Sequence, residues 1–408
     1  MGPAHRTRPG TPGAGDTPRH PETKGRDLLT NTIRPYAWGS TTAIAELTGE
    51  TPTGEPQAEL WMGAHPGAPS STPRGSLPDV IAADPERELG AGTVARFGPR
   101  LPFLLKLLAA DRPLSLQVHP DLVQAREGYA AEQRQGIAVD APHRNYKDAN
   151  HKPELICALT DFEGLCGFRP AADTADLFEG LGVPALAPHV ETLRTLPEGE
   201  ALRRVLTAVL TGDAGETART VAATAAACER LDGRYEVFAR IARHFPGDPG
   251  VLASMLLHHI RLAPGDALYL SAGVPHAYLR GLGVELMSTS DNVLRCGLTP
   301  KHVDVPELLR VVRFESCGAD VLRPRTLPDG EELYETPVDE FRLSRHRLTD
   351  GAPAVDLTRP APQVLLCTEG GVRVGELKLA PGASVFVPAG ERTEVSGSGT
   401  LFRATVSC

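Results

Sequence analysis

The sequence predicts a mainly β protein with two related β units and an inserted α-helical unit. Three observations support this fold class: a strand–turn motif that occurs twice, strand-like apolar runs on both sides of the chain's middle, and helical periodicity between them. At 408 residues the chain is too long for one ordinary hydrophobic core, so several domains are expected. The predicted divisions are a disordered tail (1–28), a first β unit (29–170 with 259–315), the helical insert (171–258) and a second β unit (316–408).

Composition and charge narrow the class of protein. Hydrophobic residues make up 41% and charged residues 23%, which is typical of a soluble globular protein. The net charge is −9 and no block of Lys and Arg occurs, so nucleic acid and an anionic membrane are not expected as partners. An anionic small molecule remains compatible with this charge. The seven cysteines are scattered without a Cys-x-x-Cys motif, which favours reduced thiols in a cytoplasmic protein over a disulfide framework.

The first part of the chain contains a polar tail and then short strands. Residues 1–28 are rich in Pro, Gly, Arg and Thr and lack the apolar centre of a signal peptide. Order is expected from about Leu28. Residues 101–108 form an apolar run with Lys106 as its one charge, which indicates a buried strand. Lys106 then either extends to the edge of the sheet or points into a cavity.

The segment from Ser115 to Asp121 is the most informative stretch. In a strand, successive side chains point to opposite faces, so Ser115, Gln117 and His119 share one face while the apolar residues between them pack inward. Three polar groups on one face suggest a site, although an edge strand with a solvated face remains the alternative. A short helix is predicted over 120–135 and a polar loop over 143–150.

Residues 171–258 have a sequence pattern typical of α-helices rather than of strands. Apolar side chains recur at helical spacing and alanine is abundant, with Gly and Pro mostly between the periodic segments. We interpret this unit as scaffold or as a lid. A further short helix is predicted over 301–313.

The strand–turn motif is an internal repeat. Residues 262–273 read Leu-Ala-Pro-Gly-Asp-Ala-Leu-Tyr-Leu-Ser-Ala-Gly, and residues 379–390 read Leu-Ala-Pro-Gly-Ala-Ser-Val-Phe-Val-Pro-Ala-Gly. Paired units of this kind build double-sheet barrels of the jelly-roll type, including cupins. Three residues after the final Gly, the first copy has His276 and the second has Thr393. The second barrel is therefore expected to be metal-free, with a structural or regulatory role.

Four residues form a candidate metal site. His276 follows a Gly-Val-Pro turn, and it joins Gln117, His119 and the carboxylate of Glu154. Two imidazoles, one carboxylate and one amide suit a borderline divalent cation, above all Zn²⁺. The alternative is that each is an ordinary buried or surface residue, since Gln is an uncommon zinc ligand.

Cationic side chains gather in the same parts of the sequence. Arg295 and Lys301 flank a turn downstream of His276, and Lys106, Lys152 and the hydroxyl of Ser115 are further candidates. Such groups around a metal site would hold a phosphate or stabilise an oxyanion. Alternatively, the charges belong to a solvated loop.

Taken together, these motifs resemble the type I mannose-6-phosphate isomerases (phosphomannose isomerases) of the cupin superfamily. The resemblance runs in order from about residue 29 to 310 and rests on Tyr-Ala-Trp-Gly (36–39), Gln-x-His (117–119), Lys-Pro-Glu (152–154), Pro-His-Ala (275–277) and Arg-x-Gly-Leu-Thr-Pro-Lys (295–301). It implies one zinc per chain, bound by Gln117, His119, Glu154 and His276. It also implies Arg295 as a catalytic residue and Ser115, Lys106, Lys152 and Lys301 as groups that grip a sugar phosphate, with Glu285 beside the substrate.

The expected reaction interconverts mannose 6-phosphate and fructose 6-phosphate through a cis-enediol(ate), with His151, Lys152, Glu285 or a zinc-bound water as the proton carrier. Two alternatives stay open. An Fe(II) cupin such as a dioxygenase would use a similar ligand set but would not need the cations. A non-catalytic sugar-phosphate-binding regulator would be expected to lack ligands in both barrels. The expected partner is a phosphorylated hexose, and the oligomeric state is not predicted, although a monomer is compatible with the sequence.

Overall fold

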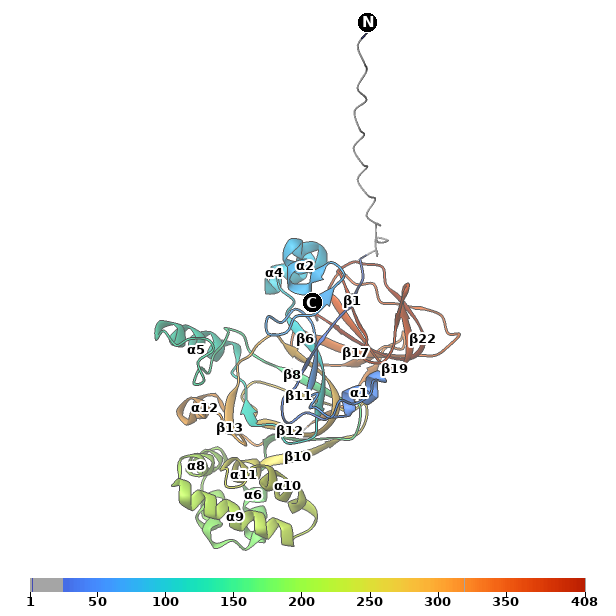
Figure 1. Ribbon diagram of the computed structural model, residues 1–408. Helices are drawn as coiled ribbons and strands as arrows, with labels where there is room; N and C mark the ends of the chain where they lie inside the picture. The colour runs from blue at the N-terminus through green and yellow to red at the C-terminus, as the bar shows by residue number, and fades with distance from the viewer. Residues whose placement is uncertain (1, 3–24, 319, 408) are drawn as a thin grey trace.

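The structure is a computed structural model that describes residue 2, residues 25–318 and residues 320–407. The predicted tail therefore lies largely outside the described residues. Two large sheets lie beside each other, and a helical unit sits at the far end of the first sheet from the second (Figure 1). Every pairing between the named strands is antiparallel, so the mainly β prediction is confirmed at this level.

The first sheet has eleven strands and carries the candidate site residues. Its central path runs, in spatial order, through β14 (Val321–Leu322), β11 (Ala267–Leu270), β8 (Glu154–Ala158), β12 (His276–Ser288), β6 (Phe103–Ala110), β3 (Glu59–Met62) and β2 (Thr32–Arg34). Four more strands complete the sheet, namely β7 (Leu116–Val118), β9 (Phe162–Phe168), β10 (Leu257–Leu262) and β13 (Leu294–Gly297). Strands β7 and β9 pair with β12, while β13 pairs with β7 and β10 pairs with β9. The long strand β12 thus pairs with β6, β7, β8 and β9, which brings widely separated segments together.

The second sheet has nine strands. They are β1 (Asp27–Leu29), β21 (Ser384–Val387), β19 (Gln363–Val374), β22 (Glu394–Thr405), β17 (Arg342–Leu348), β16 (Glu332–Tyr334) and β15 (Arg325–Thr326), with β18 (Val355–Asp356) on β22 and β20 (Leu377–Leu379) on β19. A separate hairpin joins β4 (Ser71–Thr72) to β5 (Gly75–Ser76).

The two sheets share a hydrophobic core. Leu107 and Val284 of the first sheet belong to the same buried cluster as Tyr334, Phe386 and Phe402 of the second. The Tyr334 hydroxyl donates to the backbone carbonyl of Gly265 at 2.9 Å, which is a direct polar link between the sheets. Burial of this apolar surface joins the two sheets into one body.

The predicted repeat has the same backbone in both copies. Gly265 and Gly382 adopt φ values of +92° and +84°, and Gly273 and Gly390 adopt +78° and +74°. Side-chain-bearing residues rarely adopt these conformations, which explains the glycine at each turn. Between the turns lie β11 in the first copy and β21 in the second.

The helices lie around the sheets. Those outside the insert are α1 (Ala43–Thr48), α2 (Leu77–Ala83), α3 (Pro85–Leu89), α4 (Ala91–Phe97), α5 (Leu122–Arg134) and α12 (Val305–Val311). Those of the helical unit are α6 (Ala171–Leu181), α7 (Ala187–Thr195), α8 (Glu198–Thr211), α9 (Ala214–Arg230), α10 (Glu236–His244) and α11 (Gly250–Ser254). The core of this unit extends onto the first sheet, where Leu116, Val118 and Leu294 are buried against it.

The predicted elements over 101–108, 120–135 and 301–313 correspond to β6, α5 and α12. Asp121 starts α5 with a capping box, in which its side chain accepts from the Gln124 amide and the Gln124 side chain accepts from the Asp121 amide.

Two features differ from the predicted divisions. Strand β1 begins at Asp27, inside the range predicted as a tail, because Leu29 is buried in the core shared by the sheets. Strand β14 lies in the range predicted for the second β unit, yet it pairs with β11 of the first sheet.

Candidate active site

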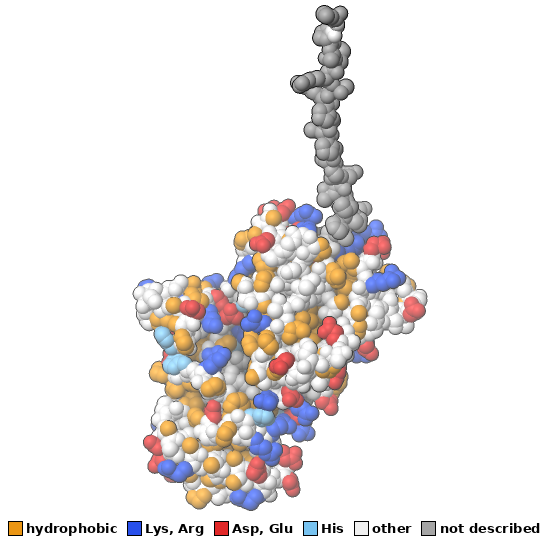
Figure 2. Space-filling model, in the orientation of Figure 1, with side chains coloured by type: hydrophobic (Ala, Val, Ile, Leu, Met, Phe, Trp, Pro, Cys, Tyr) orange, Lys and Arg blue, Asp and Glu red, His pale blue; other side chains and the backbone are white. Residues whose placement is uncertain are grey.

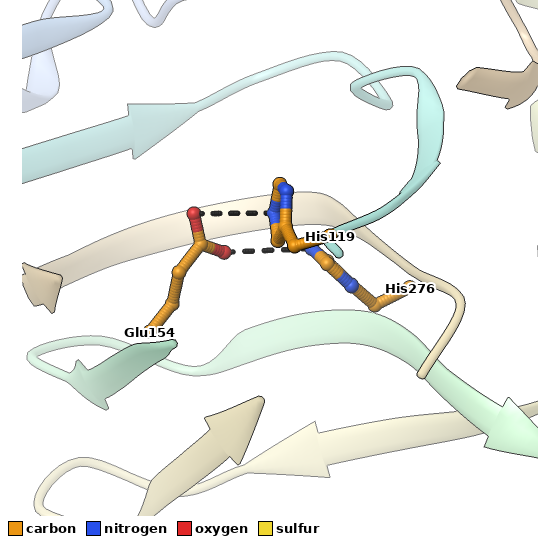
Figure 3. A group of neighbouring side chains, drawn as sticks. All are labelled: His119, Glu154 and His276. Atoms are coloured by element: carbon orange, nitrogen blue, oxygen red, sulfur yellow. Dashed lines mark ion pairs between the residues drawn. The ribbon is translucent and has the colours of Figure 1, made fainter. Parts of the chain in front are cut away.

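Three side chains from different strands converge at the centre of the first sheet. His119 follows β7, while Glu154 and His276 are the first residues of β8 and β12. The Nε2 atoms of His119 and His276 each lie 3.4 Å from one of the two Glu154 oxygens (Figure 3). We refer to these three residues as the histidine–glutamate cluster. All three are buried, with 2% exposure or less.

Backbone carbonyls fix the protonation of both imidazoles. The Nδ1 atom of His119 lies 2.8 Å from the Asn292 carbonyl oxygen, and that of His276 lies 3.0 Å from the Val274 carbonyl oxygen. A carbonyl only accepts, so each Nδ1 carries a hydrogen and each Nε2 presents a lone pair. Neither Nε2, nor Oε2 of Glu154, has a hydrogen-bond partner among the described residues. Unpartnered buried acceptors that face one another are what a divalent cation requires.

The electrostatics of the cluster suit a cation. Burial lowers the pKa of His119 to about 4, so the imidazole is neutral at physiological pH. Burial opposes the charge on Glu154, but the neighbouring Lys152 and His119 outweigh it and hold the pKa of that carboxyl well below its usual range. The Lys152 ammonium lies 2.9 Å from Glu154 Oε1. The cluster therefore combines two imidazoles with one carboxylate, which is a donor set typical of Zn²⁺.

Glu154 of the cluster lines a cleft of about 640 Å³. Gln117 lines this cleft. In the strand register it stands opposite His276 on β12 and opposite Arg295 on β13. The predicted alternation is confirmed, because Leu116 and Val118 are buried against the helical unit while Ser115 and Gln117 line the cleft. The cleft is also lined by the other predicted residues Lys106, Lys152, Glu285, Arg295 and Lys301.

Lys106 points into the cleft rather than to the edge of the sheet. Its Nζ lies 2.9 Å from Glu285 Oε2 and 3.7 Å from Glu59 Oε1, and 5.1 Å from the centre of the Trp61 ring. Burial disfavours the ammonium, but Glu285 and Glu59 outweigh it and raise the pKa of Lys106. Lys106 is thus a fixed positive charge on the cleft wall.

A second group of cations also lines the cleft. Arg295, Lys301 and Lys147 all line the cleft, and none has a carboxylate oxygen within 4.0 Å among the described residues. Burial lowers the pKa of Arg295, and burial together with Arg295 and Lys147 lowers the pKa of Lys301. Like charges held together without acids are arranged to receive an anion.

His151 is placed differently from the other predicted residues. Its Nε2 lies 2.6 Å from Oε1 of Glu340, in the loop before β17, and His151 is not part of the cleft lining. A catalytic role for His151 stays a prediction.

Several residues of the site were not predicted from the sequence. Glu59 and Trp61 complete the surroundings of Lys106, and Trp61 Nε1 donates to Glu59 Oε2 at 2.6 Å. Asn292, which is fully buried, accepts from the Lys147 amide and offers its carbonyl to His119. A lone acid in the apolar strand 59–62 was the available signal for Glu59, whereas nothing local marks Asn292. Among the described residues, no helix is both long and apolar enough to cross a membrane.

Comparisons with known proteins agree with this geometry. Residues 28–171 match the family model "Phosphomannose isomerase type I, catalytic domain". The chain is 40% identical to mannose-6-phosphate isomerase of Escherichia coli K12 over 92% of this chain and 98% of that protein. It is 30% identical to mannose-6-phosphate isomerase 1 of Arabidopsis thaliana over 92% of each. Its structure is similar to a crystal structure of mannose 6-phosphate isomerase from Salmonella typhimurium bound to fructose 6-phosphate and zinc, with a TM-score of 0.88, 38% identity and coverage of 94% of this chain and all of that one.

Proposed function

This chain belongs to the type I phosphomannose isomerase family, and on that premise we propose that it interconverts mannose 6-phosphate and fructose 6-phosphate with a bound zinc ion. The observation that carries the proposal is the histidine–glutamate cluster, with its unpartnered acceptors, whose Glu154 lines a cleft that is also lined by cations.

His119, Glu154 and His276 would hold the zinc ion, and Gln117 is proposed as the fourth ligand because it neighbours His276 in the strand register. The donor set fits the metal, since each imidazole presents an Nε2 lone pair. When bound, zinc supplies a Lewis acid that lowers the cost of negative charge on the substrate oxygens.

The chain's own side chains bind and orient the substrate in this proposal. Arg295 and Lys301, which have no carboxylate partner in the described part of the chain, would attract the phosphorylated sugar and stabilise its negative charge, together with Ser115. Lys106 is fixed between Glu59 and Glu285 and would keep its charge throughout the reaction.

A proton must move between C1 and C2 of the sugar in this isomerisation. Lys152 and Glu285 line the cleft, so we favour them over His151 as the proton carrier. Each group would have to lie within hydrogen-bond reach of the migrating proton.

The alternatives are less well supported. An Fe(II) dioxygenase would not need Arg295, Lys147 and Lys301 around the metal site, and a non-catalytic regulator would not need a complete ligand set.

We further propose that both sheets are cupin-type jelly-roll barrels, with residues 171–258 as an inserted domain. The matching left-handed glycines of the two repeat copies support this architecture. In the second copy Thr393 is buried and its hydroxyl donates to a backbone carbonyl, so that barrel is proposed to be metal-free. A cytoplasmic location is proposed on the six free cysteines of the described chain.

Chelation tests the proposed function directly. We expect isomerisation of mannose 6-phosphate to stop after EDTA removes the metal and to return when Zn²⁺ is added back, because the cluster alone cannot stabilise the enediolate. Metal content should be measured on the same samples. Full activity in protein shown to be metal-free would contradict the proposal.

A further inference from the structure

One carboxylate of the helical insert binds the backbone of a loop that lines the cleft. Asp248 lies in the turn between α10 and α11, and its side chain accepts three backbone N–H groups. One belongs to its own turn, from Gly250 at 2.7 Å. The other two come from the loop that follows β13, from Leu298 at 3.1 Å and Thr299 at 3.0 Å. A carboxylate that only capped α11 would not need the last two bonds.

The loop that Asp248 holds is the one that carries Lys301. The bonds form a chain, because the Thr299 amide donates to Asp248 while the Thr299 hydroxyl accepts from the Lys301 amide at 3.1 Å. Leu298, Thr299 and Lys301 all line the cleft. The backbone of Lys301 is therefore linked, through Thr299, to a residue of the helical insert.

The loop conformation needs such support. Leu298 has φ of +55° and is the one non-glycine residue with positive φ in the described part of the chain. Side-chain-bearing residues keep this conformation when their surroundings fix it. The backbones of the insert and of this loop also approach closely, since a Cβ atom added at Gly250 would lie 2.3 Å from the Leu298 nitrogen.

From these contacts we propose that Asp248 is a positioning residue for substrate binding, through which the helical insert sets the place of Lys301 at the cleft. The inference rests on the proposed function and extends it, because it gives the helical insert a part in binding the phosphorylated sugar. Asp248 touches no substrate atom in this proposal and acts through the loop at 297–301.

Substitution of Asp248 by alanine tests the inference. We expect Asp248→Ala to raise KM for mannose 6-phosphate about tenfold with kcat within about twofold, because a loop displaced by about 1 Å weakens binding more than chemistry. Asp248→Asn keeps one acceptor oxygen and should fall between wild type and Asp248→Ala. Zinc content should equal that of wild type in both variants.

A matched control separates positioning from general stability. Asp213 caps α9 in the same helical unit by accepting from the Glu216 amide at 2.9 Å, and it is not part of the cleft lining. Asp213→Ala should leave KM within about twofold of wild type. An equal rise in KM for Asp213→Ala would overturn the inference.

Two further variants test whether Asp248 acts through the loop and Lys301. Gly250→Ala places a methyl group against the loop backbone and should also raise KM, even if Asp248→Ala fails to fold. In a Lys301→Ala background, Asp248→Ala should add less than about a twofold change, because both substitutions affect the same cation. Independent, multiplying effects would show that Asp248 does not act through Lys301.

Calorimetric binding of inorganic phosphate gives a readout that needs no turnover. Weaker phosphate binding in Asp248→Ala than in Asp213→Ala supports the inference even if wild type fails to isomerise mannose 6-phosphate, in which case the proposed function alone is wrong. Normal isomerisation by wild type with unchanged KM and phosphate affinity in Asp248→Ala would refute the inference and leave the proposed function standing.

Discussion

Each imidazole of the histidine–glutamate cluster is oriented by a main-chain carbonyl rather than by an acidic side chain. The residue types and their motifs were sufficient to identify His119, Glu154 and His276, because few side chains bind a borderline metal. The carbonyls of Asn292 and Val274 could not be predicted in the same way, since a main-chain group has no residue signature. Only the folded path of the chain places them beside the rings.

The residues around Lys106 illustrate the same limit. An isolated lysine in an apolar strand left two possibilities open, and the sequence could not choose between the sheet edge and the cavity. The choice is made by Glu285, which stands opposite Lys106 on β12, and by Glu59 on β3, two residues from the Trp61 that stands opposite Lys106. The register of three strands is set by the tertiary structure, so the local sequence around Lys106 does not reveal it.

At Arg295 the expected effect of substitution is large. Arg295→Ala should lower kcat/KM about a hundredfold, because it removes a cation that would stabilise the developing charge. Zinc content should be unchanged, because Arg295 is not a ligand. Arg280 on β12 is exposed and outside the cleft, so Arg280→Ala serves as the matched control. Loss of zinc, or unchanged turnover, would show that the role assigned to Arg295 is wrong.

Among the elements, β7 shows how much a short pattern can predict. Its alternation of polar and apolar residues was visible in the sequence, and the structure places the polar face on the cleft and the apolar face on the helical unit. The sequence could not show that the covering layer would be the insert, because that contact joins segments far apart in the chain. The interpretation of the insert as scaffold or lid was therefore incomplete.

The insert is also attached to the first sheet by a charged cluster. Glu163 on β9 accepts from His259 of β10 and from Arg240 of α10. The hydrogen bond from His259 and the Arg240 guanidinium, against partial burial, lower the pKa of Glu163 to about 2. On the face of the molecule in Figure 2, acidic and basic side chains are interspersed over the lower part, where the helical unit lies.

The depressed pKa of Glu163 predicts a pH-dependent contribution to stability. The unfolded chain binds a proton at Glu163 more readily than the folded chain, so the contribution is present above about pH 4.5 and is lost as the pH falls towards 2. Because the group is partly exposed, we expect Glu163→Gln to cost only about 1 kcal/mol at pH 7.

Urea unfolding of wild type and Glu163→Gln at pH 7, 5, 4 and 3 measures this contribution. The difference in unfolding free energy should shrink at the two lowest values. As a control, Glu229 pairs with Arg243 on the exposed surface of the helical unit, and Glu229→Gln should change stability by less than about 0.5 kcal/mol. A constant Glu163→Gln difference across this range would contradict the assignment.

For the whole molecule, the two sheets are expected to unfold together. Their shared core contains Phe386 of β21 and Val284 of β12, so loss of one face exposes the other. The two β units were predictable from the repeat, but their common core was not, because the two faces that meet lie in different repeats. The apolar residues of each unit gave no sign of which face would be covered by the other.

Truncation of Phe386 tests this cooperativity. Phe386→Ala should lower the unfolding free energy by about 3–5 kcal/mol through the cavity it leaves. Trp38 and Trp61, the two tryptophans of the sequence, lie outside the second sheet. Tryptophan fluorescence and far-UV circular dichroism should therefore shift to the same new midpoint. A fluorescence midpoint that stays at the wild-type value would show that the sheets unfold separately.

Strand β1 gives this architecture a temporal consequence. Its residues are translated long before their partners in β21. Until β21 is translated, β1 lacks the strand that pairs with it, and that edge stays open. The second sheet can therefore be completed only after β21 has been translated.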